Sequence, residues 1–258
     1  MRSDTSRPGG DAPDVERSSV AAWDAPTRIF HWSLVILIVS AWATFQLTEV
    51  MGDPRLTWHR WNGLLLLTLI VWRLLWGIAG PPHARFASFL KGPGAIAGYL
   101  RDLAAGRPRR FLGHNPAGGL MVVSLIALVA TIGSLGLFAV EHNDLATGPL
   151  YRLVGNDIAK VLTGWHRFLF EPVLIALVVL HIGVNVTYTF VKRDPLIPAM
   201  ITGRKPAADY EDAGALAPMS AEAIRFRAFG CLALASAIVF GGLTALGGRL
   251  PPWPKVGW

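Results

Sequence analysis

Cysteine is almost absent from this chain of 258 residues, which contains only Cys231. A lone cysteine excludes an intrachain disulfide framework, a C-x-x-C-H site for covalent haem attachment and a four-cysteine iron–sulfur cluster. Any metal cofactor would therefore depend on histidine or carboxylate ligands. We expect Cys231 itself to be a small packing residue.

Charge is also scarce. Only 16% of the residues are charged and 52% are hydrophobic, whereas soluble domains carry about 25% charged residues. Five apolar stretches are each long enough to cross a hydrocarbon core, which needs about 20 residues. They cover approximately residues 29–48, 61–80, 116–140, 168–191 and 228–247. The sequence therefore predicts an all-α integral membrane protein that crosses the bilayer several times, rather than a soluble domain with buried helices.

The first 25 residues lack the basic start and apolar middle of a signal peptide. They mix acidic and basic side chains and contain no apolar run. We therefore expect residues 1–25 to form a disordered cytoplasmic head, with the first apolar span acting as the insertion signal.

The net charge of +7 is distributed as in a membrane protein rather than as in a nucleic-acid-binding protein. Segments 1–28, 81–115 and 192–227 carry four, six and six Lys/Arg; segments 49–60, 141–167 and the residues after 248 carry two, three and two. Lys and Arg accumulate on the cytoplasmic side of membrane proteins. This bias predicts a cytoplasmic N-terminus and, after five spans, a C-terminus on the opposite side of the membrane.

The spans and loops suggest a division of the chain. Residues 26–195 are expected to form a four-helix transmembrane domain, within which segment 83–115 contains a helix lying in the interface. Segment 141–165 is expected to be the largest external loop. The proline-rich residues 196–227 are expected to be a cytoplasmic linker. Residues 228–258 would add a fifth transmembrane helix, without histidine, and a short periplasmic tail.

Four of the seven histidines lie at or inside the apolar spans: His31, His59, His166 and His181. A ligand-capable side chain in a bilayer is costly and is a functional-site candidate by default. Two of them lie in the only internal repeat, Trp58-His59-Arg60-Trp61 and Trp165-His166-Arg167-Phe168. Both repeats belong to the external side, which suggests one shared level.

Helix geometry relates the histidines of the fourth span. The 15 residues from His166 to His181 correspond to a rise of roughly 22 Å and an angular offset of about 60°. One helix thus offers an imidazole at each of two depths. His59 is expected to pair with His166 at the external level, and His31 with His181 at the internal level. His114, just before the third span, is the competing inner partner.

His31 and His181 can pair only if both lie at the same depth in the membrane. His31 lies only three residues after Arg28, whereas His181 lies eleven before Lys192. The pair can share a level only if the first span starts deeper or the fourth span projects beyond the membrane.

Two bis-histidine sites would suit two non-covalently held haems. Such sites leave no open iron position and favour electron transfer over oxygen chemistry. Arg28, Arg60 and Arg167 lie within a few residues of the expected ligands, where a guanidinium could pair with a haem propionate. Membrane topology alone would also explain these arginines. Arg73, inside the second span, can either reach the cytoplasmic surface or contact a buried anion.

Several motifs together resemble the prokaryotic cytochrome b561 family over roughly residues 20–200. They are Trp23-Asp-x-Pro-Thr-Arg-x-x-His31-Trp32, Trp58-His59-Arg60, Gly113-His114-Asn115-Pro116 with Gly118-Gly119, and His166 with His181. The family includes the cytochrome b subunit of membrane-bound nickel–iron hydrogenases. The resemblance implies a four-helix core with two b-type haems ligated by His31 with His181 and by His59 with His166. The fifth span is extra to that core.

These observations lead to one functional hypothesis and two alternatives. The chain would carry electrons across the inner membrane between the quinone pool and a periplasmic redox protein, either a hydrogenase or a c-type cytochrome. The partner would meet the external haem at the 141–165 loop, and quinone would bind near spans one and four. The alternatives are a membrane anchor or assembly subunit whose histidines bind no cofactor, and a transporter whose histidines relay protons.

Overall fold

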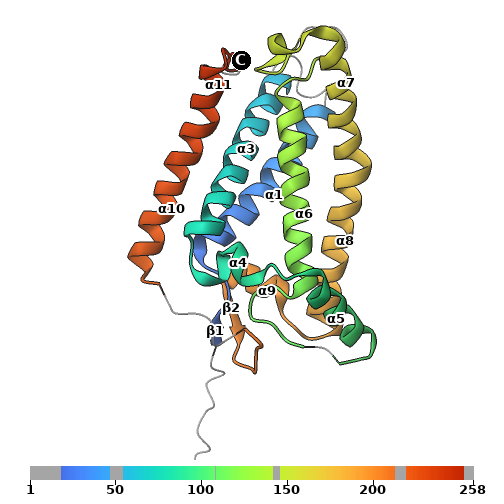
Figure 1. Cartoon of the computed structure of the whole chain (residues 1–258), viewed down its shortest axis with the longest axis vertical. Coiled ribbons are helices and arrows are strands. Elements are labelled where there is room, and N and C mark those ends of the chain that lie inside the picture. The colour runs from blue at the N-terminus through green and yellow to red at the C-terminus, as the bar shows by residue number, and fades with distance from the viewer. Residues whose placement is uncertain (1–18, 47–54, 108, 142–145, 213–218, 253–258) are drawn as a thin grey trace, which may run out of the picture.

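The computed structural model describes residues 19–46, 55–107, 109–141, 146–212 and 219–252. Within them, five helical rods are long and apolar enough to cross a membrane (Figure 1). Three are single helices: α1 (Ala25–Gln46), α3 (Arg55–Ala79) and α6 (Pro116–Gly136). The fourth rod joins α7 (Gly155–Phe168), η3 (Leu169–Leu174), α8 (Ile175–Val186) and η4 (Thr187–Val191), and the fifth joins α10 (Ala221–Ser236), η6 (Ala237–Gly241) and α11 (Gly242–Ala245).

Local sequence signals explain several helix ends. Asn115 caps α6, because its side-chain oxygen accepts a hydrogen bond from the N–H of Gly118 at 2.7 Å and Pro116 follows as the first helical residue. Ser220 caps α10 in the same way by accepting from the N–H of Ala223 at 3.2 Å. α3 ends at the Gly80-Pro81 step, which cannot continue a helix.

The fourth rod differs from the sequence expectation. It runs for 37 residues from Gly155 to Val191, about 55 Å at the α-helical rise, and so exceeds the roughly 30 Å hydrocarbon core. The prediction of an external loop over 141–165 is therefore wrong from Gly155 onward. Pro172 lies in η3, a π-helical turn that accommodates the missing N–H without ending the rod.

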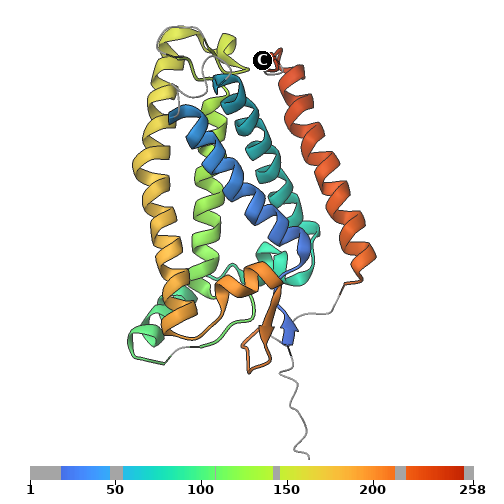
Figure 2. The ribbon, with the colours of Figure 1, turned by 180° about the vertical axis from the view of Figure 1, so that it is seen from behind.

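The first four rods enclose the interior of the bundle. One cluster joins Ile70 of α3 with Ile126 and Val129 of α6 and Leu174 of the fourth rod. The fifth rod packs mainly beside α3 (Figure 2), where the Trp72 indole N–H donates to the carbonyl oxygen of Ala228 at 3.0 Å. The four-helix core with one added helix is thus confirmed.

One end of the bundle, here called the inner end, carries additional small elements (Figure 1). They are β1 (Ser19–Ala21), η1 (Pro82–Ala84), α4 (Phe86–Phe89), α5 (Pro93–Ala104), α9 (Leu196–Thr202) and β2 (Arg204–Pro206); at the opposite, outer end lies η2 (Tyr151–Leu153). The helix predicted within 83–115 is therefore present as α5. Strands β1 and β2 pair antiparallel, with Ser19 opposite Pro206. Within the part of the chain that the structure describes, the helices are thus accompanied by one two-stranded sheet.

This sheet corrects two boundaries drawn from the sequence. Most of the predicted disordered head lies outside the described residues, but residues 19–24 are ordered, and Ala22 and Trp23 are buried. Segment 196–227 is not only a linker, because α9 and β2 belong to it. Its Lys205 side chain is buried and bonded to the Asp194 carboxylate and the Phe111 carbonyl oxygen, both at 2.9 Å.

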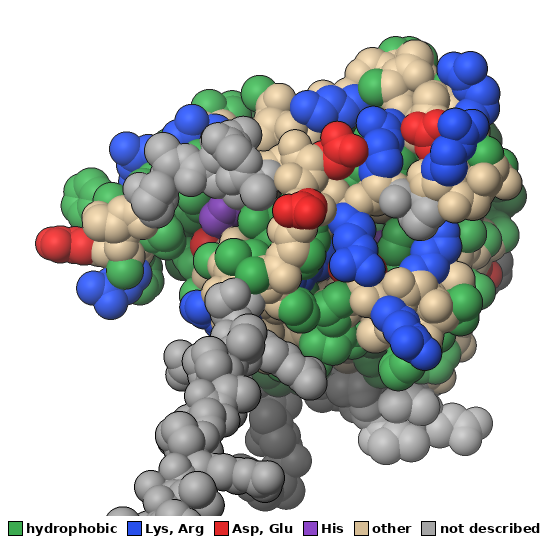
Figure 3. Space-filling model, turned by 90° about the horizontal axis from the view of Figure 1, so that it is seen from below, with side chains coloured by type: hydrophobic (Ala, Val, Ile, Leu, Met, Phe, Trp, Pro, Cys, Tyr) green, Lys and Arg blue, Asp and Glu red, His purple; other side chains and the backbone are tan. Residues whose placement is uncertain are grey.

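The face at the inner end is basic. Figure 3 shows Lys and Arg side chains gathered over it. The exposed basic residues of its elements and loops include Lys91, Arg101, Arg107, Arg109, Arg110, Arg193 and Arg204.

Candidate functional site

Two pairs of imidazole rings face each other across the bundle. At the outer end, the ring centroids of His59 on α3 and His166 on α7 lie 6.1 Å apart with an interplanar angle of 81°. At the inner end, those of His31 on α1 and His181 on α8 lie 6.5 Å apart at 43°. We call these the outer pair and the inner pair. They combine the histidines that the sequence predicts to face one another.

Both spacings suit a metal ion shared between two rings. A metal–imidazole bond of about 2.0 Å on each side, plus about 1.1 Å from nitrogen to centroid, separates the centroids by about 6.2 Å. A direct N–H···N hydrogen bond would bring them to about 5 Å. The described residues contain no group of three or more His, Cys, Asp or Glu that could hold a metal ion. Each histidine pair therefore offers a metal ion two ligands, rather than the four of a metal ion held by protein side chains alone.

The rings of the outer pair are oriented by the main chain. Nδ1 of His59 lies 2.9 Å from the carbonyl oxygen of Ala41 on α1, and Nδ1 of His166 lies 2.8 Å from that of Ile132 on α6. A carbonyl oxygen can only accept, so each Nδ1 carries the proton and each Nε2 of the neutral ring is unprotonated. This hydrogen bond to the second nitrogen is the usual support of a metal-binding imidazole.

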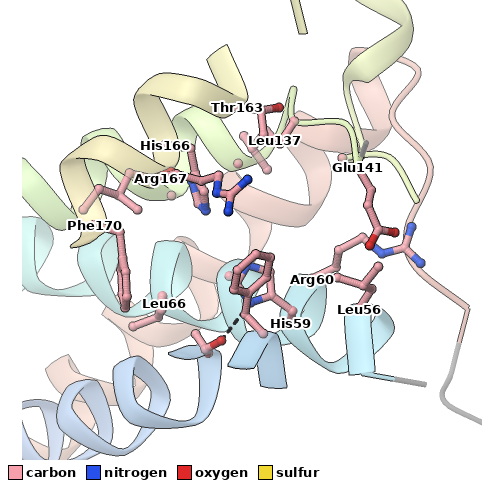
Figure 4. A pocket seen from close by; sticks show the side chains of 18 of the residues that line it. Leu56, His59, Arg60, Leu66, Leu137, Glu141, Thr163, His166, Arg167 and Phe170 are labelled. Carbon is pink, nitrogen blue, oxygen red and sulfur yellow. Dashed lines mark hydrogen bonds between the residues drawn. The ribbon is translucent and has the colours of Figure 1, made fainter. Parts of the chain in front are cut away.

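A large cavity surrounds the outer pair (Figure 4). Its volume is about 860 Å³, and α1, α3, α6, α7 and the outer loops line it. Glycine keeps it open, since a Cβ on Gly136 would lie 3.1 Å from Cε1 of His166. Its volume and its mainly apolar lining, with a few polar side chains, suit an apolar molecule with a polar edge.

Two predicted arginines reach this cavity. Nη1 of Arg60 donates to the carbonyl oxygen of Thr147 at 3.1 Å, while its buried Nε has no hydrogen-bond partner. The Arg167 guanidinium lies over the Phe45 ring, 5.5 Å from its centroid. In Figure 4 the Arg167 side chain lies beside His166. Arg60 and Arg167 therefore bring positive charge to this cavity, whose lining also includes the acids Glu141 and Glu171.

The inner pair has different support. Nδ1 of His31 is buried and has no hydrogen-bond partner. The amide nitrogen of Asn185, one turn beyond His181, donates to the His181 carbonyl oxygen at 2.6 Å and lies 3.4 Å from its ring Nε2. The third predicted arginine, Arg28, uses Nη1 to bond the carbonyl oxygen of Ile201 in α9. Arg28 therefore ties α1 to the inner-end elements, and its role toward a ligand stays a prediction.

His114 does not join the inner pair. Its ring packs against Trp23 and Phe89, with centroid distances of 4.6 and 4.5 Å. Burial, together with the nearby positive charges of Arg73 and of other basic side chains, lowers the pKa of His114 to about 3. His114 is therefore a neutral packing residue near neutral pH, and the inner pair contains His31 and His181.

The length of the fourth rod resolves the mismatch in depth. His31 and His181 face each other, although α1 begins six residues before His31 and η4 ends ten residues after His181. The fourth rod therefore extends further past their shared level than α1 does. The π-helical turn η3 lies between His166 and His181, and both rings still turn toward the interior of the bundle.

A polar cluster that was not predicted from the sequence forms around Asp24 at the inner end, just before α1. The buried Asp24 carboxylate accepts from the Thr27 N–H at 2.7 Å and hydroxyl at 2.8 Å, and lies 3.0 Å from Nε2 of His83. Burial raises the pKa of Asp24, but the hydrogen bonds from His83 and Thr27 outweigh it and leave that pKa below its ordinary value. The D-x-x-T spacing before an apolar run was the available signal.

Comparison with known proteins identifies the family. The family model described as prokaryotic cytochrome b561 matches residues 22–203. The chain belongs to the prokaryotic cytochrome b561 family. It is therefore a multi-pass helical membrane protein and a b-type cytochrome that functions in electron transfer. The ring spacing of the outer pair and its protonation at Nδ1 fit a site in which the two histidines would hold haem iron.

Three curated relatives are similar over most of their length. Each is named a probable Ni/Fe-hydrogenase B-type cytochrome subunit. The protein of Rhizobium leguminosarum bv. viciae is 24% identical over 77% of this chain and 93% of its own. That of Azotobacter chroococcum mcd 1 is 25% identical over 73% and 89%. That of Rhodobacter capsulatus is 23% identical over 80% and 91%.

Proposed function

We propose that this cytochrome carries electrons across the bacterial inner membrane through two haems, between a periplasmic redox protein and the quinone pool. The observation that carries this proposal is the pair of facing histidine couples, with ring centroids 6.1 and 6.5 Å apart. They are separated along the fourth rod by roughly 22 Å. Two irons at these levels would connect the two sides of the membrane.

Each couple would hold one haem. His59 and His166 would ligate the outer haem through Nε2, and His31 and His181 the inner one. Bound haem supplies reversible one-electron oxidation and reduction of its iron. Because two histidines would hold each iron, the sites would favour electron transfer over oxygen chemistry. Arg60 and Arg167 would offset the negative charge of propionates at the outer cavity, and Arg28 is the corresponding residue predicted at the inner end.

The basic inner end would face the cytoplasm. The surplus of Lys and Arg on that face supports this orientation (Figure 3). The N-terminus would then be cytoplasmic and the outer cavity would open toward the periplasm. A hydrogenase is the favoured periplasmic partner, because the relatives are named as hydrogenase subunits; a c-type cytochrome is the alternative. Quinone would react at the inner haem.

Haem content tests this proposal directly. Protein purified from haem-replete cells should show a reduced b-type spectrum with about two haems per chain, and His166→Ala should keep about one. His83→Gln, a histidine outside both pairs, is the control and should keep two. A colourless, folded preparation would instead support the anchor or transporter function, and full haem content in all four single His→Ala variants would refute the ligand assignment.

A further inference from the structure

Arg73 is a buried cation without a counter-ion among the described residues. Its side chain is on α3, and the residue is 3% exposed. The guanidinium lies over the Phe86 ring, 4.7 Å from the centroid, and Nη1 is buried without a hydrogen-bond partner. An unpaired guanidinium inside a membrane bundle is costly. The sequence-level alternative that Arg73 reaches the surface does not hold.

One described acid acts on Arg73 through its charge but forms no ion pair with it. That acid is Asp24, whose two oxygens bond Thr27 and His83. No described carboxylate forms an ion pair with Arg73. Its Nη1 is therefore open to the carboxylate of a bound molecule.

Packing between α1 and α3 sets Arg73 level with His31. The rings of Phe30 and Trp72 stack with centroids 5.6 Å apart, and the Trp76 indole N–H donates to the Thr27 hydroxyl at 3.2 Å. His31 and Arg73 directly follow the two stacked residues. Each therefore lies one residue further along its helix, a rise of about 1.5 Å. The two residues share one depth within about 3 Å.

The two side chains also turn to the same side. From Phe30 to His31, and from Trp72 to Arg73, each helix rotates by about 100°. Since α1 and α3 run antiparallel, these rotations carry His31 and Arg73 to one common side of the helix pair. His31 meets His181 there. Arg73 and His181 both act electrostatically on His114. This indicates that the two side chains lie in the same part of the bundle.

We propose that Arg73 is the counter-ion of a haem carboxylate at the inner pair. This inference rests on the proposed function, because it requires a haem between His31 and His181. Arg73 would not touch the iron. It would act as a positioning residue, neutralising a propionate inside the bundle and favouring the reduced, less positive iron. The Arg28 guanidinium bonds the Ile201 carbonyl oxygen through Nη1, whereas its buried Nε has no hydrogen-bond partner.

Potentiometric titration of the purified holoprotein tests the inference. The spectral component that His31→Ala removes is the inner haem. Arg73→Gln should lower the midpoint potential of that component by about 59 mV, which for one electron is a tenfold change in the equilibrium constant for reduction. Arg73→Lys, which keeps the charge, should shift it less than threefold. The outer component should stay unchanged in both variants.

Arg85→Gln is the matched control. Arg85 lies at the same end, but its Nε donates to the Gly80 carbonyl oxygen at 2.8 Å. The proposal is overturned if the inner midpoint is the same in Arg73→Gln and wild type, or if Arg85→Gln or Arg73→Lys shifts it as far as Arg73→Gln does. If Arg73→Gln loses the inner haem or fails to accumulate, Arg73→Lys decides. If Arg73→Lys keeps both haems at wild-type midpoints, the proposal is supported. If Arg73→Lys loses the inner haem, the proposal is overturned.

These outcomes are separate from failure of the proposed function. Wild-type protein without haem would end both proposals. Wild-type protein with two haems whose midpoints do not respond to Arg73→Gln would end only the assignment of Arg73.

Discussion

At the outer end of the bundle both imidazoles are oriented by main-chain carbonyls, whereas at the inner end the environment is made of side chains. His59 and His166 each donate Nδ1–H to a helix carbonyl within 2.9 Å. His31 has a buried Nδ1 without a partner, and a charged cluster that includes Asp24 and Arg73 lies nearby. The outer ligands are thus preoriented by the fold itself, while the inner site depends on charges that substitution can remove.

Removing ligands has the largest expected effect and tests whether the pairs are independent. His59→Ala and His166→Ala should each lose the outer haem, and the double variant should lose no more. Combining His59→Ala with His181→Ala should remove both haems. Haem-to-protein ratios of purified variants measure this. Loss of two haems in the His59/His166 double variant would break the division into two separate sites.

Asp24→Asn should weaken the inner end alone. The carboxylate accepts three hydrogen bonds at the start of α1, and such caps contribute about 1 kcal/mol. The inner spectral component should therefore bleach at a lower temperature, with the outer component unchanged. The exposed Asp157→Asn on α7 is the control. Equal effects on both components would contradict the comparison.

This effect should depend on pH. The pKa of Asp24 in the folded protein lies below its ordinary value of 3.8. Its stabilisation is thus fully present above that value and is lost as the pH falls through the lower, folded value. The difference between wild type and Asp24→Asn should be constant from pH 6 to 8 and shrink only in strong acid, as thermal bleaching would show.

Gly136→Ala should affect only the outer end. The added Cβ would lie 3.1 Å from Cε1 and 3.3 Å from Nδ1 of His166, and such overpacking costs about 1 kcal/mol. We expect a broadened or partly lost outer haem spectrum. Gly183→Ala, where a Cβ meets nothing within 4 Å, should match wild type. An inner-haem change in Gly136→Ala would argue against separate sites.

Arg167→Gln should have the smallest effect. Arg167 is exposed and lies over Phe45, so solvent and salt screen its charge. The outer midpoint should fall by less than the inner midpoint falls in Arg73→Gln, and the shift should diminish at high salt. The exposed Arg152→Gln should leave it unchanged. If Arg167→Gln shifted the outer midpoint further than Arg73→Gln shifts the inner one, the proposed difference between the two ends would be wrong.

Much of the architecture could be predicted from the sequence. Runs of about 20 apolar residues specify spans because a bilayer leaves few alternatives, and all five are present. The 15-residue spacing of His166 and His181 placed two imidazoles at two depths, since α-helical rise is nearly constant. The outward extension of the fourth rod was missed because α7 is amphipathic there, with Asp157 and Lys160 among its apolar residues, and so gives a weak hydropathy signal.

The inner end could not be predicted to the same extent. The pairing of β1 with β2 joins Ser19 to Pro206, and strands of three residues carry almost no local signal. The contact of Asp24 with His83 spans 59 positions, so only the tertiary arrangement creates it. Arg73 was visible as a charge within an apolar span, but its depth beside His31 depends on the stacking of Phe30 on Trp72.

Electron paramagnetic resonance of the oxidised, purified protein tests the central claim most directly. Two haems, each held by two imidazoles, should give only low-spin ferric iron. The signals should be two distinct species, because the ring planes differ by 81° in one pair and 43° in the other, and His166→Ala should lose one of them. A single low-spin species, or a high-spin signal from iron with an open position, would contradict the account.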